Sequence, residues 1–147
     1  ILSLHDGIYY SASGAKLHPF LSLLRKRCAK DPARTAGQFG DLLTEHLEIG
    51  GALVTDLKNR ETAKADDARR RWYANADAIS AFLAGINACW KEEKWREFFY
   101  AIWDDGKEAT LRLQGDYAAD IRMFDRIETE ALRMAAYMFC GLAMRCR

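Results

Sequence analysis

The sequence predicts an all-α fold, and three observations support this prediction. Only two prolines occur, Pro19 and Pro32, and both lie in the first quarter of the chain. Ala, Leu, Glu, Lys and Arg dominate the rest of the sequence, and these residues are strong helix formers. No alternating run of Val, Ile or Thr indicates a strand. With 147 residues, half of them hydrophobic, the chain can build one core, and we expect residues 1–147 to form a single domain.

Two short helical segments are expected before the main helices. The apolar positions of residues 1–14 follow a helical spacing: Ile1, Leu4, Ile8, Tyr9 and Ala12. Gly14 and Pro19 interrupt this segment, and a second helical piece over residues 20–29 ends before Pro32. Asp31 or Thr35 is then expected to cap the first long helix.

Four longer helices are expected over residues 38–59, 61–89, 91–113 and 117–145. The first has a regular apolar stripe, and His46 falls on it between Leu43 and Gly50. The last helix has a stripe with Glu128 in its middle, formed by Tyr117, Ile121, Phe124, Ala131, Ala135, Met138 and Leu142. Long helices joined by short turns predict an antiparallel up-and-down four-helix bundle with a short extra N-terminal helix.

Charge and hydropathy argue against two classes of protein, nucleic-acid binders and membrane-spanning proteins. The 22 basic and 21 acidic residues almost cancel, which argues against a nucleic-acid binder. No segment reaches the roughly 20 apolar residues needed to span a bilayer. The four cysteines lack CxxC spacing, so we interpret them as buried free thiols of a cytoplasmic protein, with disulfides left open. The first residue is Ile1 rather than Met, which leaves open that the natural chain extends before it.

Two ionisable residues, His46 and Glu128, interrupt apolar stripes and are the main candidates for chemistry. His5 lies on the apolar side of the first segment, and Asp105 lies near the apolar Ile102 in the helix expected over residues 91–113. A buried carboxylate needs a partner, and imidazole with carboxylate suits Fe, Zn, Mn or Ni. The sequence therefore predicts an interior divalent-metal site formed by His46, Glu128, His5 and Asp105.

Two alternatives to the metal site remain open at this point. A buried hydrogen bond between His46 and Glu128 would satisfy both side chains without metal, in a non-enzymatic structural or interaction protein. A pocket for a small molecule beside Gly50 and Gly51 is a further alternative. The sequence has no GxxxxGK[ST], GxGxxG or GxSxG motif, so no motif assigns a reaction.

Aromatic residues lie on all sides of the helix expected over residues 91–113: Trp90, Trp95, Phe98, Phe99, Tyr100 and Trp103. Some of them belong to the core, but not all can face inward at once. We therefore expect Trp90, Tyr100 or Trp103 to form an exposed patch, through which the protein would form a homo-oligomer.

Three stretches of the chain resemble a group of small bacterial helical-bundle proteins that are hemerythrin-like or DinB-like in layout. The matching patterns are LLTEHLxIG from Leu42, WYxNAD from Trp72 and GDYxADIxxFD from Gly115. The resemblance implies that His46 and Glu128 are matching positions. Some members carry an acetylglutamate kinase label, which this chain does not support because it lacks a nucleotide-binding βαβ pattern. The chain also departs from the pattern, since Ile102 stands where a ligand histidine is expected.

Overall fold

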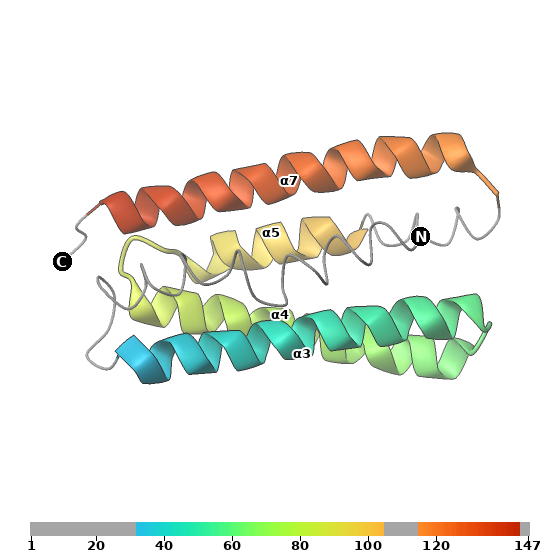
Figure 1. The fold of residues 1–147 in the computed structure, drawn as a ribbon, viewed down its shortest axis with the longest axis horizontal. Helices are drawn as coiled ribbons and strands as arrows, with labels where there is room; N and C mark the ends of the chain where they lie inside the picture. The colour runs from blue at the N-terminus through green and yellow to red at the C-terminus, as the bar shows by residue number, and fades with distance from the viewer. Residues whose placement is uncertain (1–31, 105–114, 145–147) are drawn as a thin grey trace.

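The computed structural model describes residues 32–104 and 115–144, and this part of the chain consists of four α-helices without a strand. In chain order the helices are α3 (Pro32–Lys58), α4 (Thr62–Ile86), α5 (Glu92–Asp104) and α7 (Tyr117–Ala143), shown in Figure 1. The predicted all-α class is confirmed for these residues. None of the described helices is both long and apolar enough to cross a membrane.

Helix α3 begins at Pro32, earlier than the expected residue 38. A proline at the first helical position loses no intrahelical hydrogen bond, and its fixed φ angle suits the helix. Thr35 therefore lies inside the first turn rather than before it, so the sequence prediction of Thr35 as a cap is wrong. Asp31 lies outside the described residues.

The turn between α3 and α4 closes on Arg60. The φ angle of Arg60 is 59°, in the left-handed region that usually selects glycine. The Glu61 amide donates to the Asp56 carbonyl at 2.9 Å, and the Arg60 amide donates to Leu57 at 3.1 Å. These two bonds satisfy carbonyls that the end of α3 would otherwise leave open, as in a Schellman-type cap.

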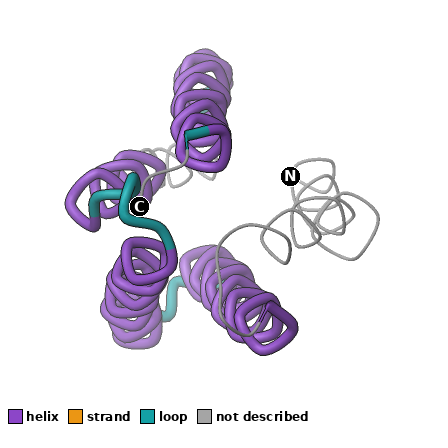
Figure 2. Tube along the Cα trace, turned by 90° about the vertical axis from the view of Figure 1, so that its left-hand side faces the viewer, coloured by secondary structure: helices purple, strands orange, loops and turns teal. Residues whose placement is uncertain are grey.

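The helices pack in chain order. Helix α3 packs against α4, α4 against α5, and α5 against α7. In Figure 1, α3 and α5 run towards the right, whereas α4 and α7 run towards the left. Figure 2 looks along the helices and shows them arranged in an arc rather than in a closed square. Helices α3 and α7, at the two ends of the arc, therefore pack on each other much less than consecutive helices do.

The core lies between the packed helices. Its most buried side chains come from α4 and α5: Ala76, Ile79, Leu83 and Trp95 have no exposed surface. Leu53 and Ile49 of α3 add apolar surface from the other side and are each only 2% exposed. Each fully buried aliphatic side chain of this kind contributes roughly 1.5–3 kcal/mol. The expected core-facing stripes of α3 and α4 are thus the faces that pack.

The loop between α4 and α5 holds the C-terminal half of α7. The Asn87 side-chain amide donates to the Gly141 carbonyl at 2.9 Å, and the Lys91 amide donates to the Tyr137 hydroxyl at 2.7 Å. The indole of Trp90 lies so close to Gly141 that an added Cβ would be 1.9 Å from Trp90 Nε1. Gly141 is therefore required here for the close approach of the two segments.

Helix α7 packs through only part of the stripe that the sequence predicts, because Leu142 is buried and Met138 packs against the core. Met134, Tyr137 and Met138 pack against the core, and Gly141 is buried. Ile121, which we expected to face inward, is 63% exposed. Ala131 and Ala135 of the predicted stripe are also exposed. The apolar residues of α7 cover more than one face, so periodicity alone assigns some of its residues to the inner side wrongly.

Candidate functional site

Among the predicted site residues that the structure describes, His46 is the most buried. It lies in the middle of α3. It is 7% exposed. Its ring lies 4.2 Å from the ring of Trp72 on α4, centroid to centroid, and 5.2 Å from that of Phe99 on α5. The prediction that His46 faces the core is therefore confirmed, and aromatic rings from two other helices enclose it.

Asn75 on α4 fixes the orientation and the tautomer of this imidazole. Asn75 Oδ1 lies 2.8 Å from His46 Nδ1. The amide nitrogen of Asn75 donates both of its protons, one to the Leu42 carbonyl at 3.2 Å and one to Glu45 Oε2 at 2.9 Å. Its oxygen can only accept, so His46 Nδ1 carries the proton. The neutral ring then has its lone pair on Nε2.

The surroundings of His46 keep it neutral. Burial among the aromatic rings lowers the pKa of His46 to about 4, and the hydrogen bond to Asn75 opposes part of that shift. Near neutral pH the side chain is therefore an imidazole with an available nitrogen lone pair. This is the form in which histidine binds a metal or accepts a hydrogen bond.

Glu128 does not lie at the inner face where the sequence places it. It is on α7 and exposed. The residues through which α7 packs, such as Met134 and Met138, lie roughly a third of a turn away around the helix, at about 100° per residue. The predicted buried pair of His46 and Glu128 is therefore wrong for the described structure, because Asn75 occupies the hydrogen-bonding position at His46.

The other predicted ligands cannot be placed. His5 and Asp105 lie outside the described residues. Within residues 32–104 and 115–144, no three side chains of His, Cys, Asp or Glu come together as a metal-binding group. Of the four predicted ligands, the described structure thus places one, His46, in the interior.

The sequence analysis did not identify Asn75 as a site residue, although its position on the apolar face of α4 indicates burial. Asn75 lies three residues after Trp72 and four before Ile79, so it shares the face of α4 that enters the core. A buried amide on an apolar face requires hydrogen-bond partners. Glu45, expected to be a solvent-facing neighbour, is exposed but also accepts a proton from Asn75.

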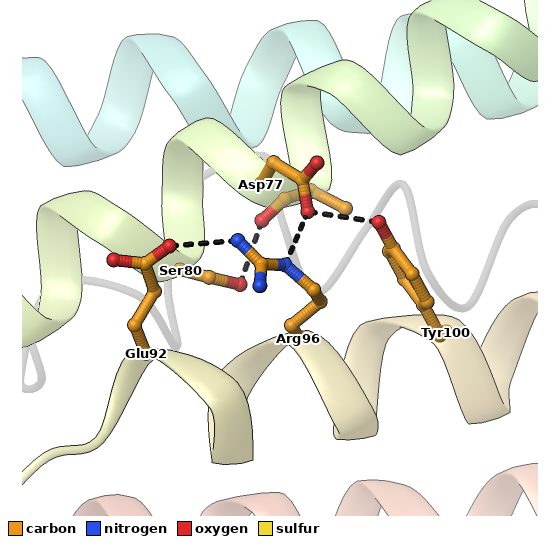
Figure 3. Close-up of polar contacts among 6 residues, drawn as sticks. Asp77, Ser80, Glu92, Arg96 and Tyr100 are labelled. Carbon is orange, nitrogen blue, oxygen red and sulfur yellow. Dashed lines mark hydrogen bonds and ion pairs between the residues drawn. The ribbon is translucent and has the colours of Figure 1, made fainter.

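A second polar cluster joins α4 to α5 near the surface (Figure 3). Asp77 Oδ1 accepts from Arg96 Nε at 2.7 Å and from the Tyr100 hydroxyl at 2.9 Å. Arg96 also donates to Glu92 at 2.7 Å. Burial, followed by the hydrogen bond to Asp77, raises the pKa of Tyr100. Every group in this cluster has a partner, so the cluster is an interhelical link rather than a reactive site.

Two of the three residues expected to form an exposed aromatic patch, Trp90 and Tyr100, are not exposed. Trp90 is 2% exposed and Trp95 is fully buried, and their rings meet edge to face at 5.5 Å. Tyr100 is partly buried and bonded to Asp77, and the side chain of Trp103 is outside the description. The arc of helices lets both tryptophans point inward, because the loop before α5 turns Trp90 onto Gly141.

The cysteines differ from the prediction of buried free thiols. Cys89 is disulfide-bonded. Cys140, on α7, is a free thiol but is exposed. Cys28 and Cys146 lie outside the described residues. Disulfides are rare in a reducing cytosol, so the cysteines no longer support the cytoplasmic prediction.

Comparisons with other proteins add no assignment. The chain matches no protein-family model, no curated protein and no solved structure. The resemblance to hemerythrin-like bundles therefore stays a prediction.

Proposed function

We propose that the whole chain is an antiparallel up-and-down bundle that includes a short N-terminal helix. The alternating directions of the four helices in Figure 1 support the antiparallel order. The packing of each helix on its neighbour in the sequence supports the up-and-down connection.

We further propose that this bundle binds a divalent transition metal in its interior, with His46 Nε2 as a ligand. The observation that carries the proposal is the tautomer of His46. Its Nδ1–H is held by Asn75 Oδ1 at 2.8 Å, which leaves the lone pair on Nε2. Histidine ligands are commonly oriented by a hydrogen bond from the other ring nitrogen to an oxygen atom, as this one is.

The fit of the described residues to a metal is partial. A neutral, oriented imidazole fits the role of one ligand, but the described residues supply no group of three. Imidazole together with carboxylate oxygen suits Fe, Zn, Mn or Ni. A complete site needs further ligands from other parts of the chain, and the proposed candidates are the carboxylate of Asp105 and the imidazole of His5, with Glu128 only if α7 turns its exposed side inward.

The level of Glu128 along the bundle is close to that of His46, although its side chain is exposed on α7. His46 lies fourteen residues after the start of α3, and Glu128 lies fifteen residues before the end of α7. These two helix ends are at the same end of the molecule in Figure 1. At 1.5 Å per residue, both side chains are about 21–23 Å from that end, at a similar level of the bundle.

Elemental analysis of the purified protein after reconstitution with Fe, Zn, Mn or Ni tests this proposal. Near-stoichiometric metal is expected in the parent chain, and its loss is expected in His46→Gln. The matched control is Glu48→Gln, which removes an exposed carboxylate of the same helix and should retain the metal. Equal metal content in the parent and in His46→Gln would refute the role of His46.

A second candidate function is that of a structural or interaction protein without metal or catalysis. The observation that favours it is that Asn75 already satisfies His46 Nδ1, so the buried ring needs no metal to be stable. This candidate predicts that chelation changes neither the unfolding free energy nor the molar mass by light scattering. A loss of stability after chelation would exclude it.

A further inference from the structure

The side chain of Asn75 on α4 bonds to a single turn of α3. Its oxygen lies 2.8 Å from His46 Nδ1, and its nitrogen donates to the Leu42 carbonyl at 3.2 Å and to Glu45 Oε2 at 2.9 Å. Asn75 is 6% exposed and His46 is buried beside it, whereas Glu45 is exposed. These contacts form a chain of hydrogen bonds from a carboxylate at the surface, through a buried amide, to a buried imidazole.

The amide of Asn75 can take two orientations, and they specify opposite tautomers of His46. In the observed orientation, Asn75 Oδ1 accepts the proton of His46 Nδ1, and the lone pair of the neutral ring is on Nε2. If the amide turned over, its NH2 group would face His46. Nδ1 would then have to accept, the ring proton would be on Nε2, and Nε2 would have no lone pair for a ligand. The orientation of this amide therefore decides which nitrogen of His46 can bind a metal.

Leu42 and Glu45 fix the orientation of the amide, because neither of their oxygens can donate. A backbone carbonyl and a carboxylate only accept hydrogen bonds, so a turned amide would place Asn75 Oδ1 against two acceptors. Glu45 is the stronger of the two acceptors. Its bond to Asn75 is 2.9 Å long, against 3.2 Å for Leu42, and it carries a charge. The Leu42 carbonyl also belongs to the hydrogen-bond ladder of α3.

We propose that Glu45 is a positioning residue for His46, which selects the Nδ1–H tautomer through Asn75 and so leaves the lone pair of Nε2 for the ligand. The inference rests on the proposed function in one respect, that Nε2 is the nitrogen that binds the metal. Glu45 needs no contact with the metal for this role. It is next to His46 in the sequence, but it acts on the ring through a residue of α4.

Loss of the Glu45 acceptor should weaken the selection and leave the fold intact. In Glu45→Ala, water replaces the carboxylate, and because water donates as well as accepts, it permits both orientations of the Asn75 amide. Only the Leu42 carbonyl then favours the observed one. The ratio of the Nδ1–H to the Nε2–H tautomer should fall about tenfold, which corresponds to about 1.4 kcal/mol. Glu45 is exposed and alanine favours helix, so α3 should be retained.

A long-range proton–nitrogen correlation spectrum of the histidine rings, recorded near neutral pH with chelator present, measures the tautomer. The His46 signals of the parent should be those of the Nδ1–H form. In Glu45→Ala, the two ring-nitrogen resonances should move towards each other as the second tautomer is populated. The matched control Glu48→Ala removes another exposed carboxylate of α3 and should match the parent, because both amide protons of Asn75 are donated elsewhere.

A conservative variant separates the hydrogen bond from a general effect of truncation. Glu45→Gln keeps an acceptor oxygen at the same position without the charge, so its tautomer ratio should lie between those of the parent and Glu45→Ala. If Glu45→Ala does not fold, Glu45→Gln decides in its place, and its ratio must then be lower than that of the parent.

Two results would overturn the proposal. The first is a tautomer ratio in Glu45→Ala equal to that of the parent, with helical circular dichroism retained, because Leu42 alone would then fix the amide. The second is an equal change in Glu48→Ala, because the cause would then be the loss of a nearby charge. Both are read without metal. Addition of Zn(II) to the parent tests the proposed function separately: a ring in the Nδ1–H form that Zn(II) leaves unchanged would contradict metal binding but not the role of Glu45 in setting the tautomer.

Discussion

Replacing His46 with glutamine should remove a defined part of the pH dependence of folding. In the folded chain, burial lowers the pKa of His46 to about 4, whereas an unfolded histidine titrates near 6.5. As the pH falls below about 6.5, the unfolded chain therefore binds a proton that the folded chain does not accept. The stabilisation due to neutral His46 is complete above pH 6.5, declines as the pH falls, and is lost below about pH 4.

The size of this effect follows from the shift. One pKa unit corresponds to 1.36 kcal/mol, so His46 should account for about 3 kcal/mol of the stability lost between pH 7 and pH 4. Carboxyl groups also titrate in this range, and for this reason the measured quantity is the difference between parent and variant. Glutamine does not titrate, and its side-chain amide can still donate to Asn75 Oδ1.

Urea unfolding followed by tryptophan fluorescence, at several pH values and with chelator present, measures this difference. The free energy of unfolding of the parent should fall more steeply with acidification than that of His46→Gln. The matched control Glu48→Gln, at an exposed position of the same helix, should follow the parent. Parallel pH profiles for the parent and His46→Gln would show that His46 has an ordinary pKa, and the argument from its burial would be wrong.

Four further substitutions test the packing. Gly141→Ala should lower the free energy of unfolding by about 1–3 kcal/mol, because its Cβ would overlap the Trp90 indole. Its control Gly40→Ala has open space around the added Cβ and should raise the free energy of unfolding by up to about 1 kcal/mol. Urea unfolding measures both changes. Asn75→Leu should cost about 2–4 kcal/mol, since it leaves the buried imidazole N–H without its acceptor; a change below 1 kcal/mol would contradict the tautomer. Arg60→Gly should raise the thermal midpoint, corresponding to about 1 kcal/mol, because it relieves a left-handed backbone, and a lower midpoint would contradict this cap.

The all-α class and the helix order could be predicted because they depend on local properties. The spacing of apolar residues in α3 places His46 on the side that packs, and the structure confirms this burial. The turn before α4 was predicted within a few residues, although the residue at its left-handed position is Arg60 rather than glycine. Periodicity is sufficient for such features when a helix has one apolar face.

Partners across helices could not be predicted in the same way. The face of α7 is ambiguous because apolar residues such as Ile121 and Met138 point to different sides of the same helix, and only packing selects between them. The partner of His46 is Asn75, twenty-nine residues along the chain, and no local pattern specifies that pair. Trp90 is buried because Gly141, far away in sequence, leaves room for it.

The direct test of the metal proposal is a long-range proton–nitrogen correlation spectrum of the histidine rings, recorded before and after stoichiometric addition of Zn(II), with His46→Gln used to assign the His46 signals. Without metal, the spectrum should show a neutral ring with its proton on Nδ1, as the contact with Asn75 requires. With Zn(II), the Nε2 resonance should shift to the range of metal-bound nitrogen while Nδ1 remains protonated. An Nε2 resonance that Zn(II) leaves unchanged would contradict the proposal that His46 is a metal ligand.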